Sequence, residues 1–399
     1  MSLLRVQRGA AEQIWQGLPM RSPRRSGSVD VTRDKSRGHS AAWAAVRVRG
    51  DLISSMPVEC YRTIGAEGIE VSAPVPPVLI EPGSHGDGQP ISIDEWLYVT
   101  QSDLDQVGNA FGVITAIDGA GKPAQIQPVD ADSVTVAIRG GKIDHYKIGK
   151  SVYQPAEIWH ERQFPVSGSP VGLSPLAYAA ASIGGYLSAQ QFALDWFAGG
   201  ATPSAILKNG KRTLDPKEAA ETKRRFMATV STGEPFVTGM DWDYTMLGAK
   251  ASESQFLEEM RYSLTDITRF YGVPADIIDA PQESGSITYA NITQRNLQLL
   301  IVNIGPAVAR RERALSRLLP NPRRVRLNSE AILRMDPQTR QTVLASKVTS
   351  RILTVDEARA SENLPPLTPE QIATTKNIFG TAPAAAAPGA VATGQGDTK

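Results

Sequence analysis

The chain has 399 residues, which is enough for two or three domains with a sizeable core. Its 41% hydrophobic and 21% charged residues are typical of a soluble protein, and no apolar run reaches the roughly 18 residues of a membrane span. The 42 basic and 41 acidic residues leave a net charge of +1, which argues against a protein that grips nucleic acid with its whole surface.

The N-terminal region, 1–38, is rich in arginine and carries eight basic residues against three acidic ones. No apolar segment with a small-residue cleavage site follows, so we expect no secretory signal. We predict a flexible basic arm, in which Trp15 with Ile14 and Leu18 offers a small apolar anchor that becomes ordered on a partner. A nucleic-acid patch and a solvated tail both fit its charge.

The next part of the chain alternates helical and extended patterns. Ser40 precedes a helix predicted over 41–55, whose apolar residues, Trp43 among them, recur at helical spacing. Short alternating segments follow in "MPVECYRTI", "GNAFGVITAID", "IQPVDADSVTVAI" and "HYKIG", with a further helix near 92–107. The pattern predicts an α+β domain built on short antiparallel strands. Cys60 lies in the first strand, where we expect a buried small hydrophobic side chain rather than a reactive thiol.

After this region the pattern becomes mainly helical. Ser174 and Asp215 are predicted N-caps, each followed by proline at the first helical position. A short extended segment, "GEPFVTGMDWDYTML", comes before a third helix over 253–271. Ser252 and Gln255 have the spacing of a capping box at the start of that helix.

The end of the third helix has strong local stop signals. It closes on "FYGVP", where Gly272 can take the left-handed conformation and Pro274 blocks a restart. A small-residue loop, "APQESGSIT", leads into a longer helix over 288–319, which we expect to kink at Pro306. Two shorter helices follow, the second capped by Thr354 in a T-x-x-E box, and the Ala/Pro-rich end should be disordered.

Common catalytic and metal-binding patterns are not found in the sequence. Three Asp-x-Asp pairs could hold a divalent cation, but one lies in a predicted helix, where residues i and i+2 face different directions, and the others lack His or Lys companions. The pairs are Asp103/Asp105, Asp130/Asp132 and Asp241/Asp243. The four histidines are scattered, and neither "SGSPVG" nor "GAGKP" completes a hydrolase or phosphate-loop motif. The sequence thus predicts no catalytic residue, cofactor or metal site, and an enzyme acting on nucleic acid through an unrecognised site is the alternative.

Seven segments, taken in order, carry a family resemblance. They are "AAVRVRGDLISSMPVECYR", "GNAFGVI" with "QPVDADSVTV", "EIWHERQFPVSGSPVGLSPL", "FAGGATPSAILK", "LTDITRFYGVPADIID", "SITYANITQRNLQLLIVNIGPAVARRERALSRLL" and "LTVDEARASENLPPL". Over roughly residues 40–367 the chain resembles the portal proteins, the head–tail connectors of tailed bacteriophages, in their compact long-tailed-phage form. A gene transfer particle would carry the same segments.

This resemblance implies a non-enzymatic ring, typically of twelve copies, at one vertex of a capsid. DNA passes through the ring during packaging and ejection. The implied partners are further copies of the chain, double-stranded DNA held non-specifically in the channel, the major capsid protein, the terminase large subunit and a head–tail adaptor, with no membrane. The implied location is the virion, after assembly in the host bacterial cytoplasm. A tail or capsid shell protein is a further alternative.

The family's regions can be carried over to this chain by motif, as a portal fold with an α+β wing, a helical stem, a short β clip and a helical crown. The implied regions are an arm 1–38, a wing 39–210, a first stem helix 211–230, a clip 231–250, a second stem helix 251–274, a tunnel loop 275–288, a long kinked wing-to-crown helix 289–327, a crown 328–376 and a disordered tail 377–399.

Two sets of residues are candidates for function. The tunnel loop lacks Lys and Arg, so we hypothesise that its polar residues form a low-adhesion collar around DNA, against the simpler view of an ordinary exposed loop. They are Gln282, Glu283, Ser284 and Ser286. Residues 310–334 carry eight Arg against two Glu, and seven of these arginines could form ion pairs between subunits, face DNA, or lie on a solvated face. They are Arg310, Arg311, Arg313, Arg317, Arg323, Arg324 and Arg326.

Overall fold

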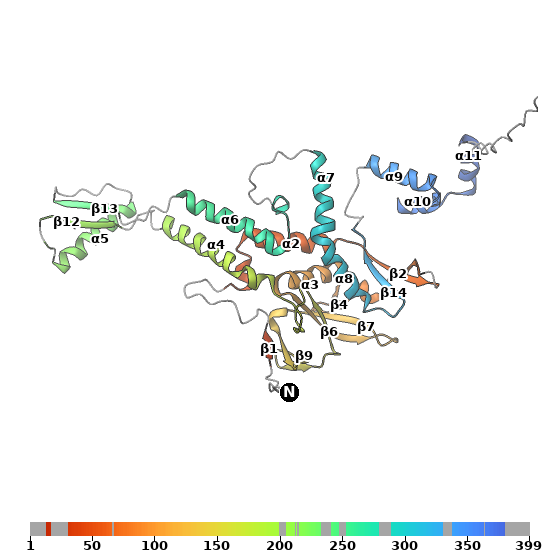
Figure 1. Ribbon diagram of the computed structural model, residues 1–399, viewed down its shortest axis with the longest axis horizontal. Helices are drawn as coiled ribbons and strands as arrows, with labels where there is room; N and C mark the ends of the chain where they lie inside the picture. The colour runs from red at the N-terminus through yellow and green to blue at the C-terminus, as the bar shows by residue number, and fades with distance from the viewer. Residues whose placement is uncertain are drawn as a thin grey trace, which may run out of the picture. The chain divides into compact units, whose positions relative to one another are not determined.

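The computed structural model divides the chain into two units, Met1–Ile332 and Leu333–Lys399 (Figure 1). The residues it describes are 13–16, 31–65, 68–198, 205–211, 213, 215–232, 241–246, 253–278, 289–329, 337–362 and 364–379.

Except for α1, which was not predicted, the helices of the first unit lie close to the predicted helical segments. They are α1 Arg33–Ser36, α2 Ser40–Ser54, α3 Ile93–Val107, α4 Pro175–Ala198, α5 Pro216–Thr232, α6 Glu253–Tyr271, α7 Tyr289–Gln298 and α8 Gly305–Ser316. A π-helical segment, Leu299–Ile304, joins α7 to α8. Ser174 caps α4 as predicted, because its Oγ accepts the backbone N–H of Ala177 at 3.1 Å.

Short strands make up the rest of this unit. They are β1 Gln13–Gln16, β2 Val58–Ile64, β3 Ile69–Ala73, β4 Gly83–Ser84, β5 Pro90–Ile91, β6 Asn109–Ile117, β7 Pro123–Val129, β8 Val134–Arg139, β9 Lys142–Ile148, β10 Ser151–Tyr153, β11 Ile158–Arg162, β12 Ala205–Asn209, β13 Trp242–Met246 and β14 Arg323–Leu327. The sheets have the orders β1-β8-β9-β10, β11-β6-β7, β14-β2-β3, β12-β13 and β4-β5. Every pairing between these strands is antiparallel, so the α+β prediction is confirmed.

The largest hydrophobic cluster surrounds α3. Trp96 of α3 is buried against Trp159 of β11, with ring centroids 4.7 Å apart, and its indole N–H donates to the backbone oxygen of Ile126 in β7. The same cluster takes in apolar residues of α2, the π-helical segment, α8 and β14. Cys60 on β2 belongs to it, free and buried as predicted.

The predicted apolar face of α2 is confirmed in part. Val46 and Ile53 are buried as predicted, but Trp43 is 39% exposed, and the N-cap is His39 rather than Ser40. Buried alanines complete the face that packs against α3 and α6.

The predicted flexible arm is partly ordered. β1 pairs with β8, with Trp15 opposite Val136, so two of the three residues of the predicted anchor belong to an edge strand of the same chain. Val31 is buried, and α1 starts at Arg33. The prediction of a flexible arm over 1–38 was therefore wrong for 13–16 and for 31–36. Pairing with β8 holds the first segment, and the ion pairs of Arg33 hold the second.

The stop after α6 has the predicted form. α6 ends at Tyr271, and Gly272 has φ +63°. The last carbonyl groups are not left unpaired, since Arg49 donates to the oxygen of Tyr271 at 3.2 Å and Asn303 donates to that of Gly272 at 2.9 Å. Side chains from two other elements thus hold the position where the chain turns.

The predicted helix over 289–327 is interrupted and shorter. Pro306 cannot donate to the carbonyl of Val302, and the π-helical segment lies immediately before this region, so the helical register changes there. Residues 323–327 are not helical, because "RRVRL" alternates exposed and buried side chains and pairs with β2 as strand β14.

The second unit contains α9 Pro337–Thr349, α10 Val355–Ser361 and α11 Pro369–Phe379. Thr354 and Glu357 form the predicted capping box at the start of α10. The proposed box at Ser252, residues 279–288 of the predicted tunnel loop and the tail from residue 380 lie outside the described residues. The first part of the predicted loop, Ala275–Ile278, is a 3-10 helical turn, and α11 extends into the tail that was predicted to be disordered.

Candidate assembly and nucleic-acid surfaces

The helix that packs along α6 is α4, not the helix near 215–230 that the sequence suggested. α5 instead lies in the connection between the two paired strands β12 and β13. Strand β12, in the region predicted as wing, pairs with β13, in the region predicted as clip.

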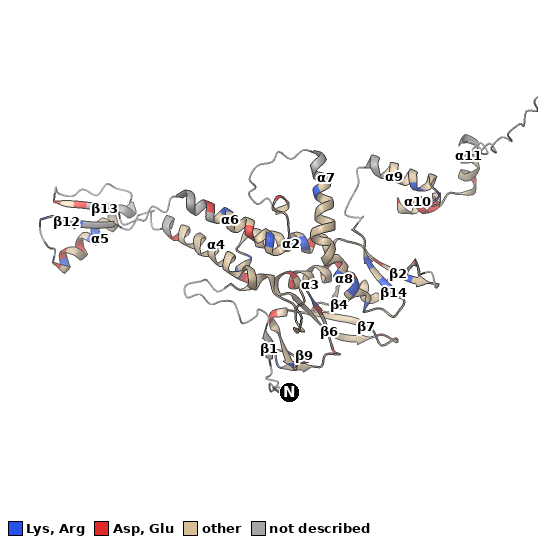
Figure 2. Ribbon diagram, viewed as in Figure 1, with Lys and Arg blue, Asp and Glu red and all other residues tan. Residues whose placement is uncertain are grey.

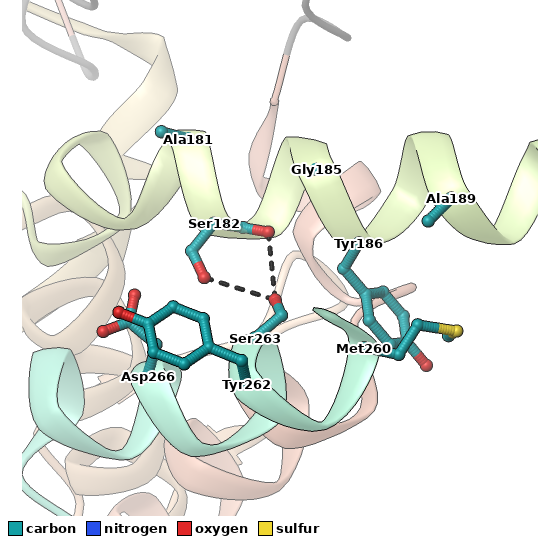
Figure 3. Close-up of a pocket in the computed structure, with 9 residues that line it drawn as sticks. All are labelled: Ala181, Ser182, Gly185, Tyr186, Ala189, Met260, Tyr262, Ser263 and Asp266. Atoms are coloured by element: carbon teal, nitrogen blue, oxygen red, sulfur yellow. Dashed lines mark hydrogen bonds between the residues drawn. The ribbon is translucent and has the colours of Figure 1, made fainter. Parts of the chain in front are cut away.

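A cavity of about 200 Å³ lies between α4 and α6 (Figure 3). On the α4 side it is lined by Ala181, Gly185 and Ala189, which follow one another at four-residue spacing and so share one face of the helix. The Ser263 hydroxyl of α6 donates to the Ser182 carbonyl at 3.1 Å and joins the two helices beside the cavity.

His39 extends this polar contact to α2. Its Nδ1 accepts the N–H of Ala42 as the helix cap, and its Nε2 lies 3.2 Å from the Ser263 hydroxyl. Its ring packs on Tyr186, with centroids 4.2 Å apart. Burial lowers the pKa of His39 to about 4, so the ring is neutral near pH 7 and Nδ1 keeps the lone pair that the cap requires.

One exposed side of α4 is apolar. The helix has 24 residues, and Asp195 is the single charged one among them. Tyr178 is 60% exposed and Phe192 is 63% exposed, and they lie on the same side of the helix because fourteen residues make close to four turns. Large exposed apolar side chains that share one side of a helix are typical of a contact surface, so this side is a candidate for assembly.

The first two Asp-x-Asp pairs are largely occupied by arginine. Arg33 of α1 forms ion pairs with Asp103, with Asp130 at 2.6 Å and with Asp132 at 3.6 Å. Burial alone would lower the pKa of Arg33, but these carboxylates raise it. The three acids therefore serve an internal ion-pair cluster.

The other member of the helical pair, Asp105, faces a different arginine. Its carboxylate lies 3.0 Å from Arg49 of α2 and accepts further hydrogen bonds from Gln101 and Gln163. Asp103 and Asp105 thus point to different partners, as residues i and i+2 of a helix must. Sequence analysis missed Arg49, although an arginine within the small-residue face of a helix is a signal for a buried ion pair.

Of the seven candidate arginines, Arg311 departs most clearly from the predicted surface location. It is 1% exposed, pairs with Glu161 at 2.6 Å and donates to the Thr100 hydroxyl at 2.6 Å. It also lies over the ring of Trp96 at 5.5 Å. Arg311 therefore contacts neither a neighbouring subunit nor DNA, because its own chain encloses it.

Three other arginines have partial partners within the chain. Arg310 lies over Phe164 at 5.8 Å, and burial lowers its pKa. Arg326 pairs with Glu70 at 2.5 Å, whereas Arg324 reaches the same carboxylate only at 3.9 Å.

The remaining arginines, Arg313, Arg317 and Arg323, have no ion pair within 4 Å among the residues that the structure describes. Figure 2 shows basic segments on both α8 and β14. These three residues, with Arg324, remain candidates for contact with an acidic partner or with DNA.

Neither a metal site nor a membrane-spanning helix is found in the described ranges. Within them, no group of three or more His, Cys, Asp or Glu side chains could hold a metal ion. No helix in the described part of the chain has the length and apolar character needed to cross a membrane. Gln282, Glu283, Ser284 and Ser286 fall in a segment outside the described residues.

Comparison with known sequences gives the family. The model of the family described as "Phage portal protein" matches residues 40–363. The chain therefore belongs to the phage portal protein family, and the resemblance seen in its motifs is confirmed. The portal protein of Enterobacteria phage HK97 is 24% identical over 357 residues, which cover 86% of this chain and 82% of that protein. The probable portal protein of Streptomyces phage phiC31 is 27% identical over 360 residues, which cover 82% of this chain and 75% of that protein.

Solved structures show the same fold. An HK97-family phage portal protein from Corynebacterium diphtheriae aligns with a TM-score of 0.60 and 15% identity, covering 78% of this chain and 100% of that one. A chain from the neck of a native GTA particle, computed with C12 symmetry, aligns with a TM-score of 0.55 and 19% identity. The alignment covers 88% of this chain and 97% of that one. These similarities establish the portal fold.

Arg311→Met should destabilise the protein, because it leaves Glu161 buried without its ion-pair partner. We expect the free energy of unfolding to fall by about 3–5 kcal/mol, measured by urea denaturation followed by circular dichroism. The matched control is Arg313→Met on the exposed side of the same helix, which should change stability by no more than about 0.5 kcal/mol. Adding Glu161→Gln to Arg311→Met should recover part of the loss. Equal stability of the two single variants would show that the buried pair has no structural weight.

Proposed function

We propose that this chain is a portal subunit of a phage or gene transfer particle, and that it assembles into a ring at one capsid vertex. The observation that carries the proposal is the exposed apolar side of α4 in a protein of the portal family. In a cyclic ring each subunit uses two different surfaces, one of which fits the other surface of its neighbour. The side of α4 that bears Tyr178 and Phe192 is one of these surfaces.

The proposed ring encloses the path of double-stranded DNA. In this proposal α4 and α6 form the stem, β12, α5 and β13 form the clip, and α9 to α11 form the crown. The ring is a docking platform for the terminase large subunit and for a head–tail adaptor, and it contacts the major capsid protein at the vertex. It carries out no catalytic step of its own. The particle is its final location, after assembly in the host bacterial cytoplasm.

Tyr178→Asp should weaken ring assembly, because a carboxylate would be buried in the apolar contact between subunits. We expect light scattering to show a shift from the oligomer towards the 42.9 kDa subunit, with the thermal unfolding midpoint of the subunit retained. The matched control is Val152→Asp, which places the same charge on a similarly exposed apolar position, 57%, of edge strand β10. An oligomer unchanged by Tyr178→Asp would show that this side of α4 is not in the interface.

The DNA path is proposed to pass the tunnel loop, whose sequence offers small polar side chains and no cation. Each lysine that neutralises a phosphate adds affinity through counterion release, so Glu283→Lys should increase DNA retention at low salt and lose this gain at high salt. Glu81→Lys, at an exposed position in the first unit, controls for the change in net charge. Retention of duplex DNA on purified rings measures the effect, and equal retention at low salt in both variants would refute the collar.

A further inference from the structure

A basic cleft lies where three segments distant in the sequence meet. Lys122 in the turn of the β6–β7 hairpin, Thr63 on β2 and the connection from the end of α8 into β14 line about 600 Å³. Its charged lining residues are Lys122, Arg317, Arg323 and Arg324, and no carboxylate belongs to the described residues that line it. Lys122 was not recognised from the sequence, because it lies almost two hundred positions before the arginines.

The chain itself leaves most of this charge unneutralised. Within the described part of the chain, neither Arg317 nor Arg323 has a carboxylate within ion-pair distance. Arg324 has only a 3.9 Å contact to Glu70, which is engaged more closely by another arginine. Lys122 donates to the backbone oxygen of Arg317 at 3.4 Å, which positions its ammonium group without cancelling its charge. A concave surface lined by one sign of charge concentrates the electrostatic potential and attracts counterions.

From this arrangement we infer that the basic cleft binds the phosphodiester backbone of duplex DNA, at a site separate from the predicted tunnel loop. All four charged side chains are hydrogen-bond donors, and phosphate oxygens are acceptors only. The arginine guanidinium groups have the planar fork that matches a phosphate. Phosphates follow the backbone of every duplex in the same way, so a contact confined to them is independent of sequence.

An acidic peptide is the other polyanion of comparable charge. A peptide brings backbone N–H donors as well as carboxylates, and those donors need acceptors. The cationic side chains of the basic cleft offer none. Of the lining side chains with acceptor oxygens, Thr63, Ser316 and Asn321, the Ser316 hydroxyl already accepts the N–H of Val325, so the donor-rich cleft favours the nucleic-acid backbone. This inference goes beyond the proposed ring, because the cleft is formed within one subunit.

The test uses the full-length protein and a short fluorescent duplex of random sequence. Binding is followed by anisotropy over a range of salt concentrations, for the wild type and for the triple variant Lys122→Gln, Arg317→Gln, Arg323→Gln. If all three cations contact phosphates, the slope of log K against log salt should become shallower by about 3 in the variant. Arg317→Gln and Arg323→Gln are also made singly, in case the triple variant does not fold, and each should reduce the slope by about 1.

The control removes the same charge from another exposed surface, through Lys142→Gln, Lys147→Gln and Lys150→Gln on and after β9. It should retain the wild-type slope. Equal slopes for the cleft and control variants would overturn the inference, as would a wild type that does not bind the duplex. If the cleft variant loses the oligomer but still binds DNA, the inference is also overturned, and the cleft instead contacts an acidic surface of another subunit. If the wild type stays monomeric but has a steeper salt dependence of DNA binding than the cleft variant, the proposed ring is refuted and DNA binding by the cleft is supported.

Discussion

Three arginines from three different helices reach the interior beside α3. Asp103 pairs with Arg33 of α1, and Asp105 pairs with Arg49 of α2. Arg311 of α8 lies between α3 and β11. Removing one partner from a buried ion pair typically costs about 3–5 kcal/mol, so each arginine is held in its place. Apolar packing alone tolerates small shifts, whereas these directional contacts fix the arrangement of α1, α2 and α8 around α3.

The same network reaches the proposed contact between subunits. Arg49, besides pairing with α3, donates to the last carbonyl group of α6, and Asn303 donates to the carbonyl of Gly272. The end of α6 is thereby attached to α2 and to the π-helical segment, and α4 packs along α6. A ring closes only if every subunit presents its contact surfaces at the same angle. We therefore regard the buried ion pairs as the basis of a fixed angle for the proposed stem.

Local rules allowed much of the fold to be predicted. Gly272 ended α6 and Thr354 capped α10, because a left-handed glycine and a capping box need only neighbouring residues. Long-range pairing was not accessible in the same way. Arg311 was assigned to a surface because runs of arginine usually are solvated, while its partner Glu161 is 150 positions away. The helix predicted over the residues of β14 was wrong for a different reason. Its sequence "RRVRL" already had the alternation of polar and apolar residues that is typical of a strand.

Ring formation is the claim on which the proposed function rests, and electron microscopy of the purified full-length chain tests it most directly. Averaged images should show a closed ring of identical subunits around a central opening wide enough for duplex DNA, with symmetry comparable to the C12 neck of the GTA particle. Separate particles the size of one 42.9 kDa chain at every protein concentration would contradict it.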